Sequence, residues 1–227
     1  MNILALDTSM GACSAAVLRV ADGMRTLHAR YAEMPRGHAE TLMPMVQEVL
    51  VEAAIEARDV DVLAATQGPG SFTGVRIAIA AARGLALVTK AKLYGTDSLT
   101  VMARAAVDSL EPQGPFAVAV DARRGMLYFG LYEATGRKLD GPRLVGPDDA
   151  ASLLPDDCEL TVGSGGSLLA DAATRPGSIV SALPDLQPNA AVLAQLALDA
   201  GETSAMLRPL YLRPPDAKPQ TQILERR

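Results

Sequence analysis

The sequence is poor in the residues that metal sites and nucleophilic enzymes use. Its 227 residues include two histidines, two cysteines and no tryptophan. The residues four before and four after His38 are Met34 and Leu42, so no helical histidine pair can bind a metal. The same shortage leaves no local Ser-His-Asp or Cys-His arrangement. Cys13 and Cys158 form neither a disulfide framework nor a four-cysteine site.

The sequence also lacks a basic stripe and a long apolar run. The net charge is -5, and the 21 lysines and arginines are scattered, whereas nucleic-acid backbones normally bind a clustered basic face. The sequence has only three phenylalanines and no tryptophan, which argues against an aromatic surface on which nucleic-acid bases stack. No apolar run reaches the ~18 residues of a membrane span, and MNILALDTS lacks the cationic start of a secretory signal. We expect a soluble, cytoplasmic protein.

What the sequence does contain is an alternation of strand and helix patterns. Asp22-Gly23 is a hairpin signal between two extended segments, and the apolar period then changes to that of a helix. A strand, helix, strand order implies a right-handed crossover and a parallel pair. The pattern therefore predicts an α/β fold with a mixed five-stranded sheet. The expected strands are 2–9, 13–20, 25–33, 62–69 and 92–98, with helices at 38–57 and 71–90.

A less regular region begins near residue 104. Residues 116–134 are typical of two strands around an Arg-Arg-Gly turn, and 189–201 of a helix that ends at Gly201. The stretch 137–187 is rich in glycine, proline and aspartate, without a recognisable motif. We predict a subdomain at 1–103, a smaller, degenerate α/β subdomain at 104–215 and a flexible tail at 216–227.

Residues 66–76, TQGPGSFTGVR, place glycines between a strand and a helix. A P-loop would need one more residue between Gly70 and Gly74 and a lysine where Val75 stands. The Gly-x-Gly-x-x-Gly fingerprint fails because Thr73 replaces its last glycine. Two interpretations remain open: a plain strand-to-helix turn, and an anion site on free backbone N–H groups.

Two further features could serve a nucleotide or an anion. Asp7 follows a buried strand and could position a metal-bound phosphate, or it could cap the following turn. Gly165 and Gly166 lie in a second glycine turn, between a strand and a possible helix. Together with Asp121, these residues would serve an independent ATPase or phosphotransferase. A metallopeptidase is disfavoured because no His-Glu-x-x-His or His-x-x-x-His occurs.

The expected helix at 71–90 is apolar almost all round and carries many small residues. Small residues allow the backbone of another helix to approach closely. This helix and the neighbouring one, which carries Met43 and Met45, offer more apolar surface than one sheet face can cover. Both internal packing and a partner interface fit this pattern.

Five segments in order resemble the TsaB (YeaZ) family: ILALDTS, RGHAETLMP, TQGPGSFTGVRIAIAAARGLA, VDARRGMLYFGLY and YLRPP. The resemblance implies an actin and sugar-kinase (ASKHA) fold and a role in making threonylcarbamoyladenosine (t6A) in tRNA. Family members are similar to the catalytic paralogue TsaD but act as its partner, joined by the ATPase TsaE. The resemblance further implies that this chain binds no cofactor strongly by itself and forms a homodimer when alone. It would contact tRNA only through the complex, which uses ATP.

The resemblance also implies site residues. The His-x-x-x-His metal pair of TsaD falls on Ser98 and Met102 here, and neither side chain can replace an imidazole. We therefore expect no catalytic residue and no metal. The helices at about 38–55 and 71–89 would pack against the partner as a four-helix arrangement. The implied partner-binding residues are His38, Leu42, Met45, Val46, Val49, Gly68, Gly70, Ser71, Phe72, Thr73, Gly74, Val75, Ala78 and Ala82.

Overall fold

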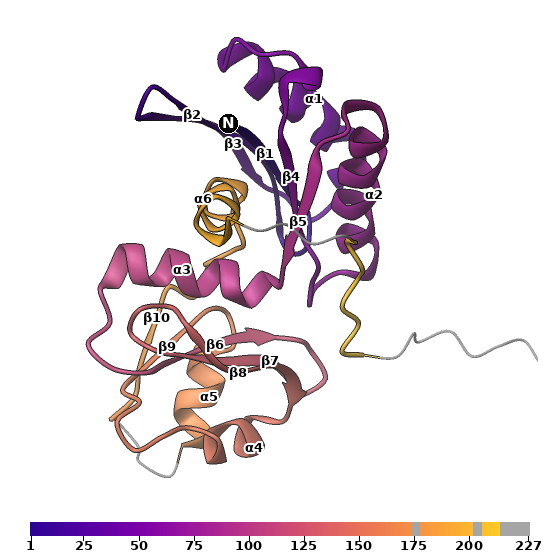
Figure 1. The fold of residues 1–227 in the computed structure, drawn as a ribbon. Coiled ribbons are helices and arrows are strands. Elements are labelled where there is room, and N and C mark those ends of the chain that lie inside the picture. The colour runs from indigo at the N-terminus through magenta and orange to yellow at the C-terminus, as the bar shows by residue number, and fades with distance from the viewer. Residues whose placement is uncertain (174–177, 202–205, 214–227) are drawn as a thin grey trace, which may run out of the picture.

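The computed structural model describes residues 1–173, 178–201 and 206–213, so the expected tail at 216–227 lies outside the described residues. The chain forms two five-stranded sheets, with strand orders β3-β2-β1-β4-β5 and β10-β9-β6-β7-β8. Helices lie between the two sheets and on their outer faces, so layers of helix and sheet alternate (Figure 1). This is the α/β architecture that the ASKHA resemblance predicts.

The first sheet is the expected mixed sheet. β1 pairs antiparallel with β2 and β2 with β3, whereas β4 runs parallel to β1 and β5 parallel to β4. The turn between β2 and β3 has positive φ at Asp22 and Gly23, as the Asp-Gly signal predicts. The strands are β1 (Asn2–Asp7), β2 (Ala12–Ala21), β3 (Met24–Glu33), β4 (Val62–Thr66) and β5 (Lys92–Thr96).

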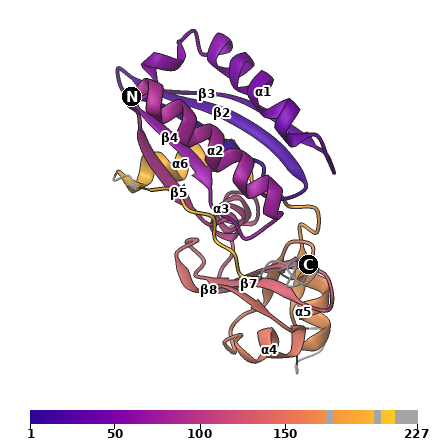
Figure 2. The same cartoon turned by 90° about the vertical axis from the view of Figure 1, so that its right-hand side faces the viewer.

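Helices cover both faces of the first sheet. α1 (His38–Glu52) and α2 (Phe72–Thr89) lie side by side on one face (Figure 2). α6 (Ala190–Ala200) packs on the other face, against the strand residues that alternate with those beneath α1 and α2. The expected helix at 38–57 ends earlier, at Glu52, because Ala54 adopts a left-handed φ of 51°. A short 3-10 turn, Ala57–Asp59, follows it.

α2 is unusually apolar for a helix that covers a sheet. Its 18 residues have a mean hydropathy of 1.4, so by length and composition alone it could cross a membrane, a criterion that a core helix also meets. This differs from the expectation that no segment is long and apolar enough. In the fold, five of the 18 residues are buried against the sheet. Much of the apolar surface of α2 is therefore left uncovered by the residues that the structure describes.

The second sheet is built around the predicted pair of strands. β6 (Phe116–Asp121) and β7 (Leu127–Tyr132) flank the Arg-Arg-Gly turn. α3 (Ser98–Leu110) packs on one face of this sheet and α4 (Pro147–Ser152) and α5 (Gly166–Ala172) on the other. The remaining strands are β8 (Lys138–Val145), β9 (Leu160–Val162) and β10 (Val180–Ala182).

Two elements differ from the expected division of the chain. The helix α3 was not expected, and the boundary at 103/104 falls inside it. Asp97 starts α3 by accepting a hydrogen bond from the Thr100 N–H at 2.9 Å. α6, placed by sequence in the second subdomain, packs through Leu193, Ala194 and Ala197 on the first sheet. Helical periodicity identifies a buried face but does not say which sheet buries it.

The chain returns to the first sheet near its C-terminus. Leu207 is buried in the core beneath α2, and a Cβ on Gly95 would lie 2.6 Å from Leu207 Cδ2. The Leu210 N–H donates to Gln67 O at 2.6 Å. Farther on, Arg213 donates to Arg123 O at 3.3 Å, at the turn between β6 and β7. Residues 206–213 therefore connect the edge of the first sheet with the second.

Candidate functional site

Glycines in the loop between β4 and α2 and in the first turn of α2 allow close packing against the loop after β1. A Cβ on Gly70 would lie 2.0 Å from Ser9 O, and a Cβ on Gly74 would lie 2.0 Å from Thr8 O. The Ser71 N–H donates to Ser9 O at 2.7 Å, and the Ser71 side chain caps α2 by accepting from the Gly74 N–H at 3.3 Å. These contacts favour the interpretation of this loop as a strand-to-helix turn.

Asp7 is held inside this loop cluster. Its side chain is fully buried, accepts hydrogen bonds from the Ser9 N–H at 3.1 Å and the Ser9 hydroxyl at 2.9 Å, and accepts another from the Thr66 hydroxyl. Burial raises the pKa of the Asp7 carboxyl from 3.8 to about 6, although the hydrogen bonds from Thr66 and Ser9 lower it. The carboxyl group therefore caps the turn after β1, one of the two roles that the sequence left open.

The raised pKa of Asp7 predicts a pH-dependent stability. Its pKa is higher in the folded than in the unfolded chain, so its contribution is largest below pH 3.8 and is lost as the pH rises through 6. We expect the free energy of unfolding of the protein, minus that of Asp7→Asn, to fall by about 2.4 kcal/mol from pH 4 to pH 8. Urea unfolding of both proteins across this range measures the difference.

The asparagine variant can keep the fold because it has the shape of Asp7 and can still accept from Ser9. A direct control is the carbon chemical shift of the Asp7 carboxyl in the unmutated protein, which should titrate with a midpoint near 6. A midpoint below 4, or a stability difference that rises with pH, would contradict the assignment.

The positions expected to correspond to the TsaD histidine pair are filled by buried, non-imidazole side chains. Ser98 and Met102 are both fully buried. The Ser98 hydroxyl donates to the Ser9 hydroxyl at 2.9 Å, which joins α3 to the loop that holds Asp7. In the part of the chain that the structure describes, no group of three or more His, Cys, Asp or Glu residues could hold a metal ion.

The second glycine turn lies between β9 and α5, as the sequence predicted. A Cβ on Gly165 would lie 2.6 Å from Leu127 Cδ2, and one on Gly166 would lie 2.7 Å from Ser181 Oγ. The Asp121 N–H donates to Ser164 Oγ at 3.1 Å. Both glycines are therefore positions of close packing against neighbouring strands. Among the described residues, no hydrogen bond joins this turn to Asp7.

Most of the expected partner-binding side chains lie in the core of the chain itself. The two helices turn these residues toward the sheet. The sequence could not show this, because the period that marks an apolar face does not tell whether a sheet or another chain covers that face. His38 is only partly buried, although its Nε2 atom is buried and has no hydrogen-bond partner among the described residues. The core residues are Leu42, Met45, Val46, Val49, Val75, Ala78 and Ala82, while Gly68, Gly70 and Gly74 pack on neighbouring backbone or side chains. Ser71, Phe72 and Thr73 are exposed.

The face of α2 that points away from the sheet carries a stripe of exposed residues at helical spacing. We call it the outer stripe: Phe72, Thr73, Arg76, Ala80, Arg83, Gly84, Leu87 and Val88. Leu87 is 77% exposed and Val88 83%, and Val51 on the neighbouring α1 is 72% exposed. Sequence reasoning noted the small residues and the excess apolar surface, but it did not select these exposed positions.

An aromatic cluster stands at the N-terminal end of the outer stripe. The Arg76 guanidinium lies 3.7 Å from the centre of the Phe72 ring, and its Nε donates to the Tyr211 hydroxyl at 2.6 Å. The Phe72 and Tyr211 rings are 5.0 Å apart. Both rings remain partly exposed, so the cluster fixes residues 206–213 to α2 and adds aromatic surface to the stripe.

The structure is similar to two solved structures from Pseudomonas aeruginosa. One is described as an uncharacterized protein with similarity to peptidase YEAZ, with a TM-score of 0.80 and 32% identity. The other is described as YeaZ, with a TM-score of 0.78 and 31% identity. Each comparison covers 93% of this chain and 99% of the other.

Sequence comparisons give the same relationship. The family model for TsaD, tRNA N6-adenosine threonylcarbamoyltransferase, matches residues 25–156. The tRNA threonylcarbamoyladenosine biosynthesis protein TsaB of Haemophilus influenzae is 31% identical over 94% of each chain. TsaB of Escherichia coli is 41% identical over 133 residues, which are 59% of this chain and 55% of that protein. This chain belongs to the TsaB (YeaZ) family.

Proposed function

We propose that this chain is a non-catalytic subunit in the synthesis of t6A in tRNA, and that it binds a TsaD-like transferase through the outer stripe and the adjacent surface of α1. The role in t6A synthesis comes from the names of its relatives. The observation that carries the binding mode is the exposed apolar surface of α2, which the described residues do not cover.

Gly84 is the most informative residue of the outer stripe. A glycine inside a helix is less stable than alanine by roughly 0.5–1 kcal/mol. A Cβ on Gly84 would meet no atom of the described residues within 4 Å, so no contact among them requires the glycine. Ala80 lies one turn before it and is also small and exposed. The backbone of a helix from another chain could approach closely here, flanked by Leu87 and Val88.

The buried loop cluster supports a subunit without chemistry of its own. The Asp7 carboxyl group accepts hydrogen bonds from the Ser9 and Thr66 hydroxyls. Ser98 and Met102, both buried, cannot bind a metal as histidines would. In this proposal ATP is used by the complex, with a TsaE-like ATPase, and this chain binds no nucleotide strongly alone. The same stripe would form a homodimer when the transferase is absent, and tRNA would be met only through the cytoplasmic complex.

Reconstitution with subunit omission tests this proposal. We expect t6A formation on tRNA to fall to background when this chain, the TsaD-like protein or the TsaE-like protein is left out, and to return when all are present. This chain alone should make no t6A. Full modification without the chain would contradict the proposal. ATP hydrolysis by the purified chain that is lost in Asp7→Asn would instead favour the independent ATPase.

A further inference from the structure

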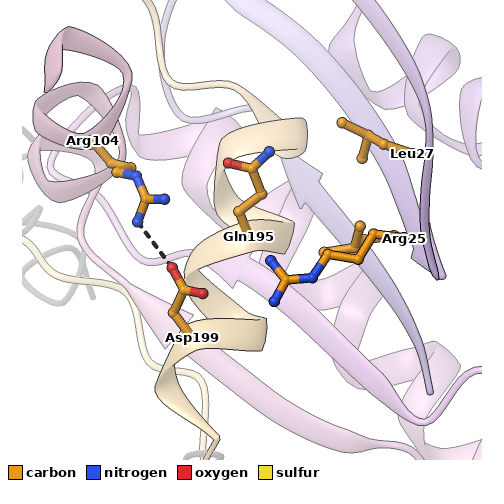
Figure 3. Close-up of a pocket in the computed structure, with 6 residues that line it drawn as sticks. Arg25, Leu27, Arg104, Gln195 and Asp199 are labelled. Atoms are coloured by element: carbon orange, nitrogen blue, oxygen red, sulfur yellow. Dashed lines mark hydrogen bonds and ion pairs between the residues drawn. The ribbon is translucent and has the colours of Figure 1, made fainter. Parts of the chain in front are cut away.

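A pocket of about 330 Å³ lies on the opposite face of the first sheet from α1 and α2 (Figure 3). It is formed where β2 and β3 meet α6 and the side of α3. It shares no residue with the outer stripe or with the loop cluster around Asp7. The lining residues are Leu18, Arg25, Leu27, Arg104, Gln195 and Asp199.

The regular spacing of each element brings these side chains together. Arg25 and Leu27 are two apart on β3, so they point to the same face, and Leu18 of β2 is the register partner of Leu27. Gln195 and Asp199 are four apart on α6, so they share one side of that helix. Figure 3 shows Arg25 and Gln195 extending toward the same space from the strand and the helix.

The two arginines of the pocket differ in whether a carboxylate pairs with them. Arg104 is fixed by two carboxylates, with Asp199 Oδ2 at 2.9 Å and Asp108 Oδ1 at 3.1 Å. Among the described residues Arg25 forms no ion pair, and no side chain donates to the second oxygen of Asp199. The pocket therefore presents a solvent-exposed guanidinium that pairs with no carboxylate of the described residues, and a second carboxylate oxygen of Asp199 that is available to a ligand. Leu27, which is 41% exposed, supplies apolar surface beside Arg25, and Leu18 lies buried next to it.

We propose that this pocket binds a free α-amino acid with an apolar side chain. The carboxylate of the ligand pairs with Arg25, and its ammonium group with the available oxygen of Asp199. The Gln195 amide hydrogen-bonds to the ligand, and the ligand side chain lies on Leu18 and Leu27. The volume is at the lower end of the range for small-molecule sites, which fits an amino acid better than a nucleotide.

Calorimetric titration of the full chain with three related compounds tests the proposal. L-Leucine carries both charges, 4-methylpentanoate lacks the ammonium group, and 3-methylbutylamine lacks the carboxylate. We expect leucine to bind saturably and each analogue to bind at least about tenfold more weakly than leucine. Arg25→Gln should weaken leucine binding about tenfold or more, so that leucine no longer binds more tightly than 3-methylbutylamine. In Asp199→Asn, leucine should no longer bind more tightly than 4-methylpentanoate. Arg104 keeps its contact with Asp108 in this variant.

Arg36→Gln is the matched control, because Arg36 is an exposed arginine in the loop before α1 and does not line the pocket. It should bind leucine as the unmutated chain does, and all variants should melt at similar temperatures. Absence of saturable binding for leucine, methionine and valine would overturn the proposal. Equal binding of leucine and 4-methylpentanoate would overturn it too, since the site would then recognise only a carboxylate. Because the pocket lies away from the outer stripe, either result leaves the proposed docking of the transferase unaffected.

Discussion

Gly84→Arg is expected to leave the isolated chain folded and to weaken its complex with a TsaD-like transferase by about 30-fold or more, which corresponds to about 2 kcal/mol. A Cβ at position 84 would meet none of the described residues, so the fold can accept a side chain there. In a helix packed closely against α2, the same arginine would collide with the partner backbone and place a charge in an apolar contact. The binding constant from titration calorimetry measures the loss.

The matched control is Ser167→Arg, which adds the same charge at an exposed position of α5 on the second sheet. It should bind the transferase as the unmutated chain does. The same pair of variants tests the proposed homodimer: if the chain dimerises through the outer stripe, Gly84→Arg should sediment as a monomer and Ser167→Arg as a dimer. Tight binding by Gly84→Arg would show that the outer stripe is not the docking surface.

Gly74→Ala is expected to lower the free energy of unfolding by about 3 kcal/mol or more. The new methyl group would lie 2.0 Å from Thr8 O, which is backbone and cannot turn away. Thr8 also binds α2 at this point, because its hydroxyl donates to Gly74 O at 2.6 Å and accepts from the Ala78 N–H at 3.2 Å. A shift of α2 would therefore break these contacts as well. Urea unfolding at constant pH measures the change.

Gly84→Ala is the control for Gly74→Ala, since it makes the same substitution in the same helix. Position 84 has open space, so alanine should raise the free energy of unfolding by roughly 0.5–1 kcal/mol. The two variants are thus expected to change stability in opposite directions. A loss below 1 kcal/mol for Gly74→Ala would mean that the loop after β1 and α2 can separate without much strain.

The sequence predicts the first sheet well because local signals there agree with the final packing. The Asp22-Gly23 turn, the continuous apolar strands and the helical period from Leu42 onward each have one reading. Helix α3 was missed because its apolar residues follow directly on a strand, without a turn of glycine or proline to separate them. The return of α6 to the first sheet depends on contacts far apart in sequence, which no local pattern records.

The sequence singled out α2 and its entry loop by their glycines and small residues, but it did not separate the roles of the individual positions. Their separate roles appear only in three dimensions: Gly70 and Gly74 meet the backbone of Ser9 and Thr8, while Gly84 meets nothing. Likewise Ala78 and Ala82 face the sheet, and Leu87 and Val88 face outward. Only the direction of each side chain separates a core position from a binding surface.

Site-specific photo-crosslinking tests the central claim most directly. A photoreactive phenylalanine analogue in place of Leu87, in the outer stripe, should crosslink to the TsaD-like transferase in the assembled complex. The same analogue in place of Leu168, which is 44% exposed on α5, is the control and should give no such product. Crosslinking from position 168 but not from position 87 would contradict the account, because the transferase would then bind the second sheet instead of α1 and α2.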